Sequence, residues 1–100
     1  MDLSEDKKNI SEYTCIFYDN KKVGYFRFYK KDDKMEIDDL YIFPQFQNMG
    51  IGTAVIEKCC KETDLKVFLY VFIKNYRAVS LYEKCGFKVI EKIRDSRYIM

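Results

Sequence analysis

The chain of 100 residues has no histidine, one proline and four glycines. Without histidine, Ser-His-Asp catalysis, Cys-His catalysis and histidine-containing zinc sites are excluded. A general base must therefore be a carboxylate, a tyrosine, a lysine, or a water molecule relayed by one of them. Eighteen basic and sixteen acidic residues nearly balance, so the charge does not favour nucleic-acid binding.

Long hydrophobic runs are also missing. The longest apolar stretch, Val67–Ile73, is far shorter than the ~20 residues that a membrane span needs. The first six residues contain three acids and do not resemble a signal peptide, and no two cysteines form a C-x-x-C pair. We therefore expect a cytoplasmic protein without membrane contact, whose four cysteines are reduced thiols.

The composition is that of a globular protein, with 48% apolar and 17% aromatic residues. Such a chain can build one hydrophobic core, and its length leaves no room for a second. We expect a single domain over residues 1–100, in which the polar residues 1–11 are loosely ordered.

Three strands are expected in the first half of the chain. β-Branched and aromatic residues are dense in Tyr13–Tyr18 and Val23–Tyr29, and Asp19-Asn20 between them is a turn signal. A third strand covers about Met35–Phe43, where Pro44 ends it. Because the connections are short, the pattern predicts an antiparallel meander.

The second half alternates between helices and strands. Apolar residues recur at helical spacing from about residue 50 to 62, and the non-alternating Leu65–Ile73 predicts a central parallel strand covered on both faces. A second helix fits Tyr76–Cys85, and two short strands follow, Lys88–Arg94 and Arg97–Met100. The predicted order is β-β-β-α-β-α-β-β. This is an α+β fold, a meander followed by a β-α-β unit, with the helices on one mixed sheet.

The second helix has capping signals at both ends. Asn75 is a suitable N-cap, and Gly86 is suited to the position after the C-terminus, with Phe87 making the hydrophobic contact beyond it.

Two glycines lie in the segment Gln47–Gly52, between a predicted strand and a predicted helix. The first N–H groups of a helix have no intrahelical partner, and glycine lets a phosphate approach them closely. A tight strand-to-helix turn explains the same glycines, so the residues alone leave both alternatives open. The segment matches neither the P-loop nor the dinucleotide fingerprint.

Two linked motifs resemble the GNAT acetyltransferase superfamily. The first is Gln-x-x-Gly-x-Gly at Gln47–Gly52, after a strand ending in Leu40–Pro44. The second is Asn75–Phe87, which resembles the family's Asn-x-x-Ala-x-x-x-Tyr-x-x-x-Gly-Phe helix. The resemblance covers residues 13–100 and implies a GNAT-like sheet. It also implies direct transfer of an acetyl group from acetyl-CoA to a primary amine in a ternary complex, without a metal.

The chain departs from the family pattern ahead of the meander. Family members usually have a strand and two helices there, and these 100 residues have no room for them. In family members those helices form the acceptor side of the site. Their absence therefore affects the acceptor pocket more than the acetyl-CoA pocket. A homodimer in which a second copy supplies the wall is one way to complete it.

The resemblance implies where acetyl-CoA binds. The pyrophosphate is expected on amides at the start of the first helix, and the pantetheine between two strands that splay apart. The implied cofactor-binding residues are Leu40, Tyr41, Ile42, Gln47, Asn48, Met49, Gly50, Ile51, Gly52, Thr53 and Asn75. A backbone N–H near Leu40–Ile42 could hold the oxyanion. Lys58, Arg77 and Lys84 are further candidates for the phosphates.

The resemblance implies Tyr82 as the general acid that protonates the departing thiolate. Tyr82 and Asn75 are seven residues apart, about two helical turns, so they share a face. The alternative is that Tyr82 only packs under the sheet. Glu36, eleven residues before Gln47, is the leading candidate for the base, and Asp38 or a relayed water are alternatives. Glu36 could also be an ordinary solvated strand residue.

Other features bear on the acceptor and on competing functions. Tyr70 occupies a second family position for the base, which argues against the mechanism of ribosomal-protein N-terminal acetylators. Glu36, Asp38 and Asp39 could attract a cationic acceptor such as a polyamine or a lysine side chain, or could be ordinary surface. Two further hypotheses are a non-catalytic acetyl-CoA- or protein-binding module of the same fold, and an acetyl-cysteine intermediate, for which no thiol-activating group is evident.

Overall fold

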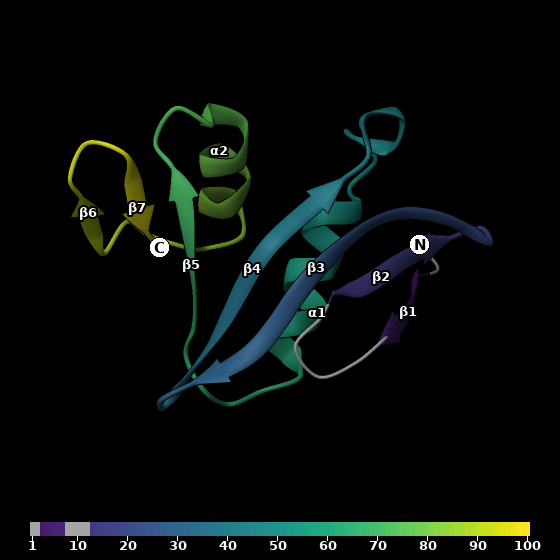
Figure 1. Cartoon of the computed structure of the whole chain (residues 1–100), viewed down its shortest axis with the longest axis horizontal. Helices are drawn as coiled ribbons and strands as arrows, with labels where there is room; N and C mark the ends of the chain where they lie inside the picture. Colours follow the sequence, from purple (N-terminus) through teal and green to yellow (C-terminus); the bar gives the residue numbers. More distant parts are fainter. Residues whose placement is uncertain (1–2, 8–12) are drawn as a thin grey trace.

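The computed structural model describes residues 3–7 and 13–100 and contains one seven-stranded sheet in the order β1-β2-β3-β4-β5-β7-β6 (Figure 1). The strands are β1 Leu3–Lys7, β2 Thr14–Tyr18, β3 Lys21–Lys31, β4 Lys34–Ile42, β5 Val67–Phe72, β6 Glu91–Ile93 and β7 Arg97–Ile99. The pairs β2–β3 and β3–β4 are antiparallel and β4–β5 is parallel. The predicted α+β architecture, the meander and the parallel crossover are therefore confirmed.

Local residue chemistry explains the connections of the meander. Asp19 and Asn20 have φ angles of 56° and 64°, the left-handed conformation of a two-residue hairpin turn, which Asp and Asn tolerate well. Beyond β4, Pro44 begins the short 3₁₀ helix η1, Pro44–Phe46, because proline has no N–H with which to continue the strand.

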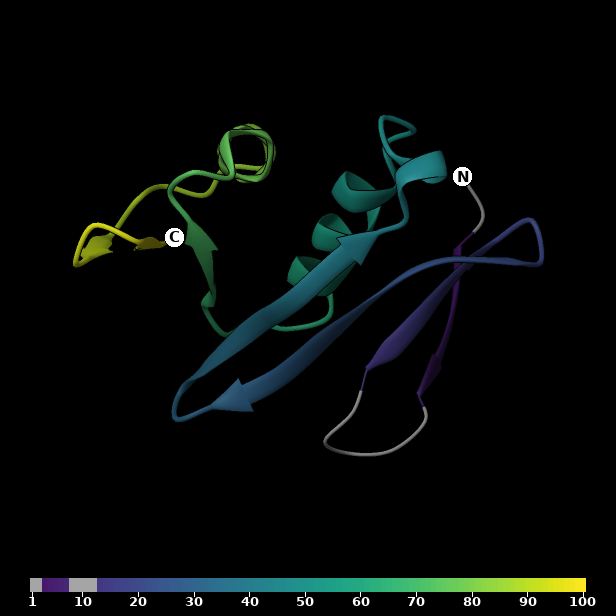
Figure 2. The same cartoon turned by 45° about the horizontal axis from the view of Figure 1, so that its top comes forward.

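Two helices cover one side of the sheet. The helix α1, Ile51–Lys61, packs against β4, and α2, Tyr76–Lys84, packs against β5. Both lie on the same side in the two cartoon views (Figures 1 and 2). Neither is long and apolar enough to cross a membrane, and the same holds throughout residues 3–7 and 13–100.

The hydrophobic core lies between the sheet and the two helices. The fully buried side chains, each less than 2% exposed, are Ile16, Val23, Ile51, Val55, Ile56, Cys59, Leu69 and Met100. Tyr82 of α2 belongs to the same cluster. The cysteines Cys15, Cys59, Cys60 and Cys85 are all free thiols.

Two local expectations need correction. Residues 3–7, expected to be loosely ordered, form β1 and pair antiparallel with β2, because an edge strand needs only backbone partners; the remaining residues up to 12 lie outside the described part. The fifth strand is not covered on both faces, since Phe72 is 64% exposed. Both described helices pack on the opposite face.

Candidate active site

The parallel strands β4 and β5 separate after three residue pairs. Their pairing ends at Ile37↔Leu69, and from Tyr70 onward β5 pairs with β7 instead. The last residues of β4, Leu40–Ile42, therefore have no partner on β5. Backbone groups along this edge are available to a ligand, as the expected splay requires.

A bulge in β4 accompanies this separation. The register between β3 and β4 shifts between the pairs Tyr25↔Tyr41 and Arg27↔Asp38, so β4 contains one residue more than β3 here. Asp39 in the shifted stretch has a φ of 52°, in the left-handed region. A bulge with a left-handed residue bends its strand and strengthens the local twist. We attribute the departure of β4 from β5 to this bend.

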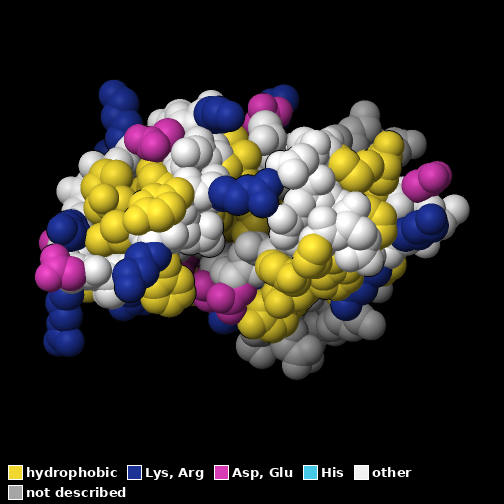
Figure 3. All heavy atoms as spheres, turned by 90° about the horizontal axis from the view of Figure 1, so that it is seen from above, with side chains coloured by type: hydrophobic (Ala, Val, Ile, Leu, Met, Phe, Trp, Pro, Cys, Tyr) yellow, Lys and Arg dark blue, Asp and Glu magenta, His cyan; other side chains and the backbone are white. Residues whose placement is uncertain are grey.

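The separation opens a cleft of about 610 Å³ between β4, the glycine loop and α2. The lining residues are Leu40, Tyr41, Ile42, Gln47, Asn48, Gly50, Asn75, Tyr76, Arg77, Ala78, Ser80, Leu81, Tyr82 and Lys84. Figure 3 shows the molecule hollowed between its two halves when it is viewed from this end. The structure thus brings together seven of the eleven predicted acetyl-CoA-binding residues and Tyr82.

The glycine loop ends at the N-terminus of α1. Gly50 is the N-cap with a φ of 78°, and Asn48 before it is also left-handed at 64°. The N-cap has no side-chain hydrogen bond, and the first helical bond runs from the Ala54 N–H to the Gly50 carbonyl. The preceding amides therefore have no partner within the helix, and the first turn has no acidic residue. Unpaired N–H groups and the lack of a nearby acidic side chain make the start of α1 a favourable binding site for an anion.

The remaining predicted loop residues act in different ways. The Gln47 side chain donates a hydrogen bond of 2.9 Å to the Ile42 carbonyl, which ties the loop to the end of β4. Ile51 is 1% exposed, packs in the core and does not line the cleft. Met49, Gly52 and Thr53 do not line the cleft; Gly52 instead permits close packing, since a Cβ there would lie 3.2 Å from Leu81 Cδ2.

Helix α2 forms the opposite wall of the cleft. The Asn75 side chain accepts a hydrogen bond of 3.2 Å from the Ala78 N–H, so the predicted N-cap is confirmed. Gly86 has a φ of 96°, and the Phe87 N–H returns to the Tyr82 carbonyl, as expected for this C-terminus.

Tyr82 lines the cleft and also packs in the core, with 8% of its surface exposed. Burial is the main reason why the pKa of its phenol rises to about 12, and Cys85 adds to the effect. The side chain therefore keeps its proton at neutral pH, which is the state that a general acid needs.

Sequence reasoning did not anticipate a contact across the cleft. Arg77 Nη2 donates a hydrogen bond of 2.7 Å to Asn48 Oδ1, which links α2 to the glycine loop. The two residues are 29 apart in sequence, so no local pattern could reveal the contact. Arg77 and Lys84 line the cleft as cations, whereas Lys58 does not.

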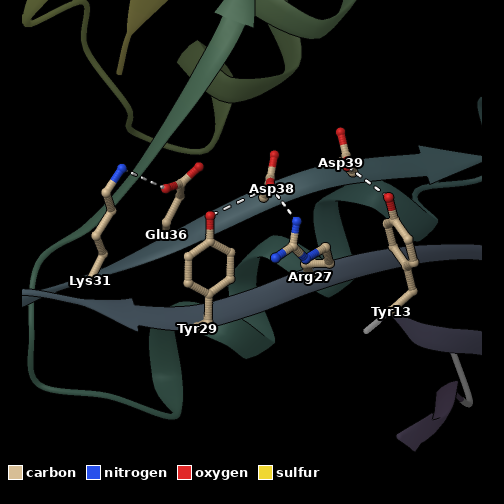
Figure 4. Close-up of polar contacts among 7 residues, drawn as sticks. All are labelled: Tyr13, Arg27, Tyr29, Lys31, Glu36, Asp38 and Asp39. Atoms are coloured by element: carbon tan, nitrogen blue, oxygen red, sulfur yellow. Dashed lines mark hydrogen bonds and ion pairs between the residues drawn. The ribbon is translucent and has the colours of Figure 1, made fainter. Parts of the chain in front are cut away.

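Glu36 lies apart from these residues. It does not line the cleft and belongs to the face of β4 away from α1, where Figure 4 shows it beside Asp38 and Asp39. It is buried, with 4% exposure, so the alternative of a solvated strand residue is wrong. It forms an ion pair with Lys31, whose Nζ lies 3.8 Å from Oε1.

Comparisons with known proteins agree with this geometry. A model of the acetyltransferase (GNAT) family matches residues 2–87, which include the glycine loop and all of α2. An uncharacterised N-acetyltransferase of Mycobacterium tuberculosis is 34% identical over 77 residues, which cover 72% of this chain and 49% of that protein. An N-alpha-acetyltransferase of Sulfurisphaera tokodaii is 33% identical over 66 residues, covering 61% and 40% respectively.

A solved structure shares the fold. The PaiA N-acetyltransferase of Thermoplasma acidophilum, crystallised in complex with coenzyme A, has a TM-score of 0.73 at 25% identity. The match covers 87% of this chain and 57% of that one. This chain spans about half the length of the curated relatives it matches. By its family match, its relatives and its fold, the chain belongs to the GNAT family of acetyltransferases.

Proposed function

We propose that this chain binds acetyl-CoA in the cleft and transfers its acetyl group directly to a primary amine. The observation that carries the proposal is the separation of β4 from β5 after Ile37↔Leu69, beside the uncapped start of α1. The end of β4 offers unpaired backbone groups that can bind the amides of pantetheine. The N-terminus of α1 offers unpaired N–H groups that can bind a phosphate.

In this proposal the pyrophosphate lies on the amides of residues 48–53, and Arg77 and Lys84 face the phosphates from α2. The pantetheine follows the backbone of Leu40–Ile42 and reaches Asn75. A backbone N–H of that strand segment then holds the thioester oxygen as it becomes an oxyanion. The thioester sulfur lies toward Tyr82, which the cleft places on the facing helix.

The reaction proceeds through a ternary complex. The amine nitrogen attacks the thioester carbon, and the proton that it must lose passes through water to Glu36 or Asp38, neither of which lines the cleft. When the tetrahedral intermediate collapses, the C–S bond breaks and the thiolate takes the Tyr82 phenolic proton. The products are an acetamide and free coenzyme A. Tyr82 regains its proton from solvent.

The test measures released thiol when the chain is mixed with acetyl-CoA and a panel of amines. We expect Tyr82→Phe to lower kcat by about 10²–10⁴-fold, the usual contribution of a general acid, while acetyl-CoA affinity stays within about twofold. Tyr98→Phe is the matched control, because Tyr98 packs against the core away from the cleft lining. Unchanged kcat in Tyr82→Phe would refute the assigned role. Binding of acetyl-CoA without thiol release from any amine would make the chain a binding module instead.

A further inference from the structure

A contact between two side chains crosses the cleft at the glycine loop. Arg77 Nη2, on the first turn of α2, donates a hydrogen bond of 2.7 Å to Asn48 Oδ1, two residues before the N-cap of α1. Figure 3 shows a basic side chain lying over the hollow between the two halves of the molecule. Because α1 packs against β4 and α2 against β5, the contact joins the two walls of the cleft.

The contact holds the guanidinium of an exposed side chain. Arg77 and Asn48 are both exposed to solvent. A long side chain in water samples many rotamers, and ordering it upon binding weakens the affinity for a ligand. The hydrogen bond to Asn48 Oδ1 orders Arg77 before a ligand arrives. The glycine loop itself is tied to the end of β4 by the Gln47 side chain, so the acceptor is also held in place.

Most of the donor capacity of Arg77 remains available. A guanidinium has several N–H donors, and the contact with Asn48 uses one of them. Within residues 13–100, Arg77 has no carboxylate partner. The fork of N–H groups matches the oxygens of a phosphate, with which it can form two parallel hydrogen bonds. The remaining donors therefore lie ready for an anion next to the uncapped start of α1.

The charge of the cleft favours the same kind of ligand. Lys84 follows Arg77 by seven residues, about two helical turns, so the two cations share a face of α2, and both line the cleft. None of the described residues that line the cleft is acidic. In a chain with sixteen acidic residues, such a lining favours a ligand that carries several negative charges.

We propose that Arg77 selects the acetyl donor and that Asn48 is its positioning residue. Held by Asn48, the guanidinium binds the nucleotide phosphates, so the protein prefers acetyl-CoA to a thioester that carries pantetheine without the nucleotide. This inference rests on the proposed function for its ligand. It goes further by assigning the donor preference to one pair of side chains, and it is testable without turnover.

The first test is binding to the full chain, by titration with acetyl-CoA and with S-acetylpantetheine, which has the same thioester but no phosphate. We expect Arg77→Met to weaken acetyl-CoA binding about tenfold, the effect of one charge-assisted contact. The affinity for S-acetylpantetheine should stay within about twofold of the wild type. A purely structural role of Arg77 would weaken the binding of both ligands alike.

Asn48→Gly tests the positioning role, because glycine adopts the left-handed backbone of residue 48 and lacks the acceptor oxygen. We expect acetyl-CoA binding to weaken about threefold, since Arg77 must then be ordered when the ligand binds. In the Arg77→Met background, the same substitution should have no further effect. Asn20→Gly is the matched control, because Asn20 has the same φ of 64° in the exposed β2–β3 turn. It should bind both ligands as the wild type does.

The binding data can overturn the inference in different ways. Arg77→Met may not weaken both ligands equally, and the effect of Asn48→Gly must vanish in the Arg77→Met background. A wild type that binds the two ligands with equal affinity would also contradict donor selection.

Thiol release separates this inference from the proposed function. With a reactive amine, the wild type should use acetyl-CoA with a kcat/KM at least about tenfold above that for S-acetylpantetheine, and Arg77→Met should reduce this ratio about tenfold. If the variants change binding as expected but no amine leads to thiol release, the proposed transfer fails while donor selection stands. If thiol is released equally from both donors, the transfer stands and donor selection fails.

Discussion

The close approach of β3 to β4 leaves no room for a side chain at Gly24. Gly24 pairs with Ile42, the last residue of β4. A Cβ at this position would collide with the carbonyl oxygen of Tyr41 and would lie 3.1 Å from both Cα and Cδ1 of Ile42. Because two of these atoms belong to the backbone, the collision can be relieved only by moving the strand.

We expect Gly24→Ala to lower the free energy of unfolding by about 1–3 kcal/mol, the usual cost of overpacking. For a domain of this size, that corresponds to a fall in Tm of roughly 5–15 °C. Circular dichroism during heating and urea titration measures both quantities. Since Tyr41 and Ile42 line the cleft, the same variant should also weaken acetyl-CoA binding.

Gly86 provides the matched control, because its φ is 96° and no atom lies within 4 Å of an added Cβ. Gly86→Ala should therefore cost about 1 kcal/mol from backbone strain alone, and Gly86→Asn less, since asparagine tolerates this conformation. If Gly24→Ala stays within about 0.5 kcal/mol of the wild type, β3 and β4 are not packed as described.

Two further predictions concern α2. Asn75→Ala should lower the unfolding free energy by about 1 kcal/mol, whereas Asn75→Asp should retain the cap, as urea unfolding can measure; equal losses would exclude the capping role. Burial raises the pKa of Tyr82 from about 10 in the unfolded chain to about 12. Its contribution to stability is therefore complete below pH ~10 and is lost as the pH rises through ~12. Tyr82→Phe should consequently lose less stability than the wild type between pH 9 and 12, in urea unfolding at a series of pH values. Equal slopes in the two proteins would contradict a raised pKa.

Much of the fold follows from short-range patterns. Asp19-Asn20 and Pro44 punctuate the meander because their backbone preferences act locally, and Asn75 and Gly86 bound α2 for the same reason. The glycine segment and α2 also supplied predicted residues that line the cleft, namely Gln47, Asn48, Gly50 and Asn75, and their role in binding stays a prediction. These features depend on one residue and its immediate neighbours.

The features that sequence reasoning missed depend on distant partners. The strand β1 has a polar sequence and exists through backbone pairing with β2, which side-chain periodicity does not report. The bulge at Asp39 is one extra residue whose effect appears only against the register of β3. The Arg77–Asn48 contact joins the glycine loop to α2 only after both have folded.

We propose that acetyl-CoA lies between the separated ends of β4 and β5, with its phosphates at the start of α1. Amide chemical-shift mapping of the ¹⁵N-labelled chain during titration with acetyl-CoA tests this most directly. We expect saturable shifts that are largest at residues 48–53 and 40–42. Shifts confined to other residues, or none at millimolar acetyl-CoA, would contradict it.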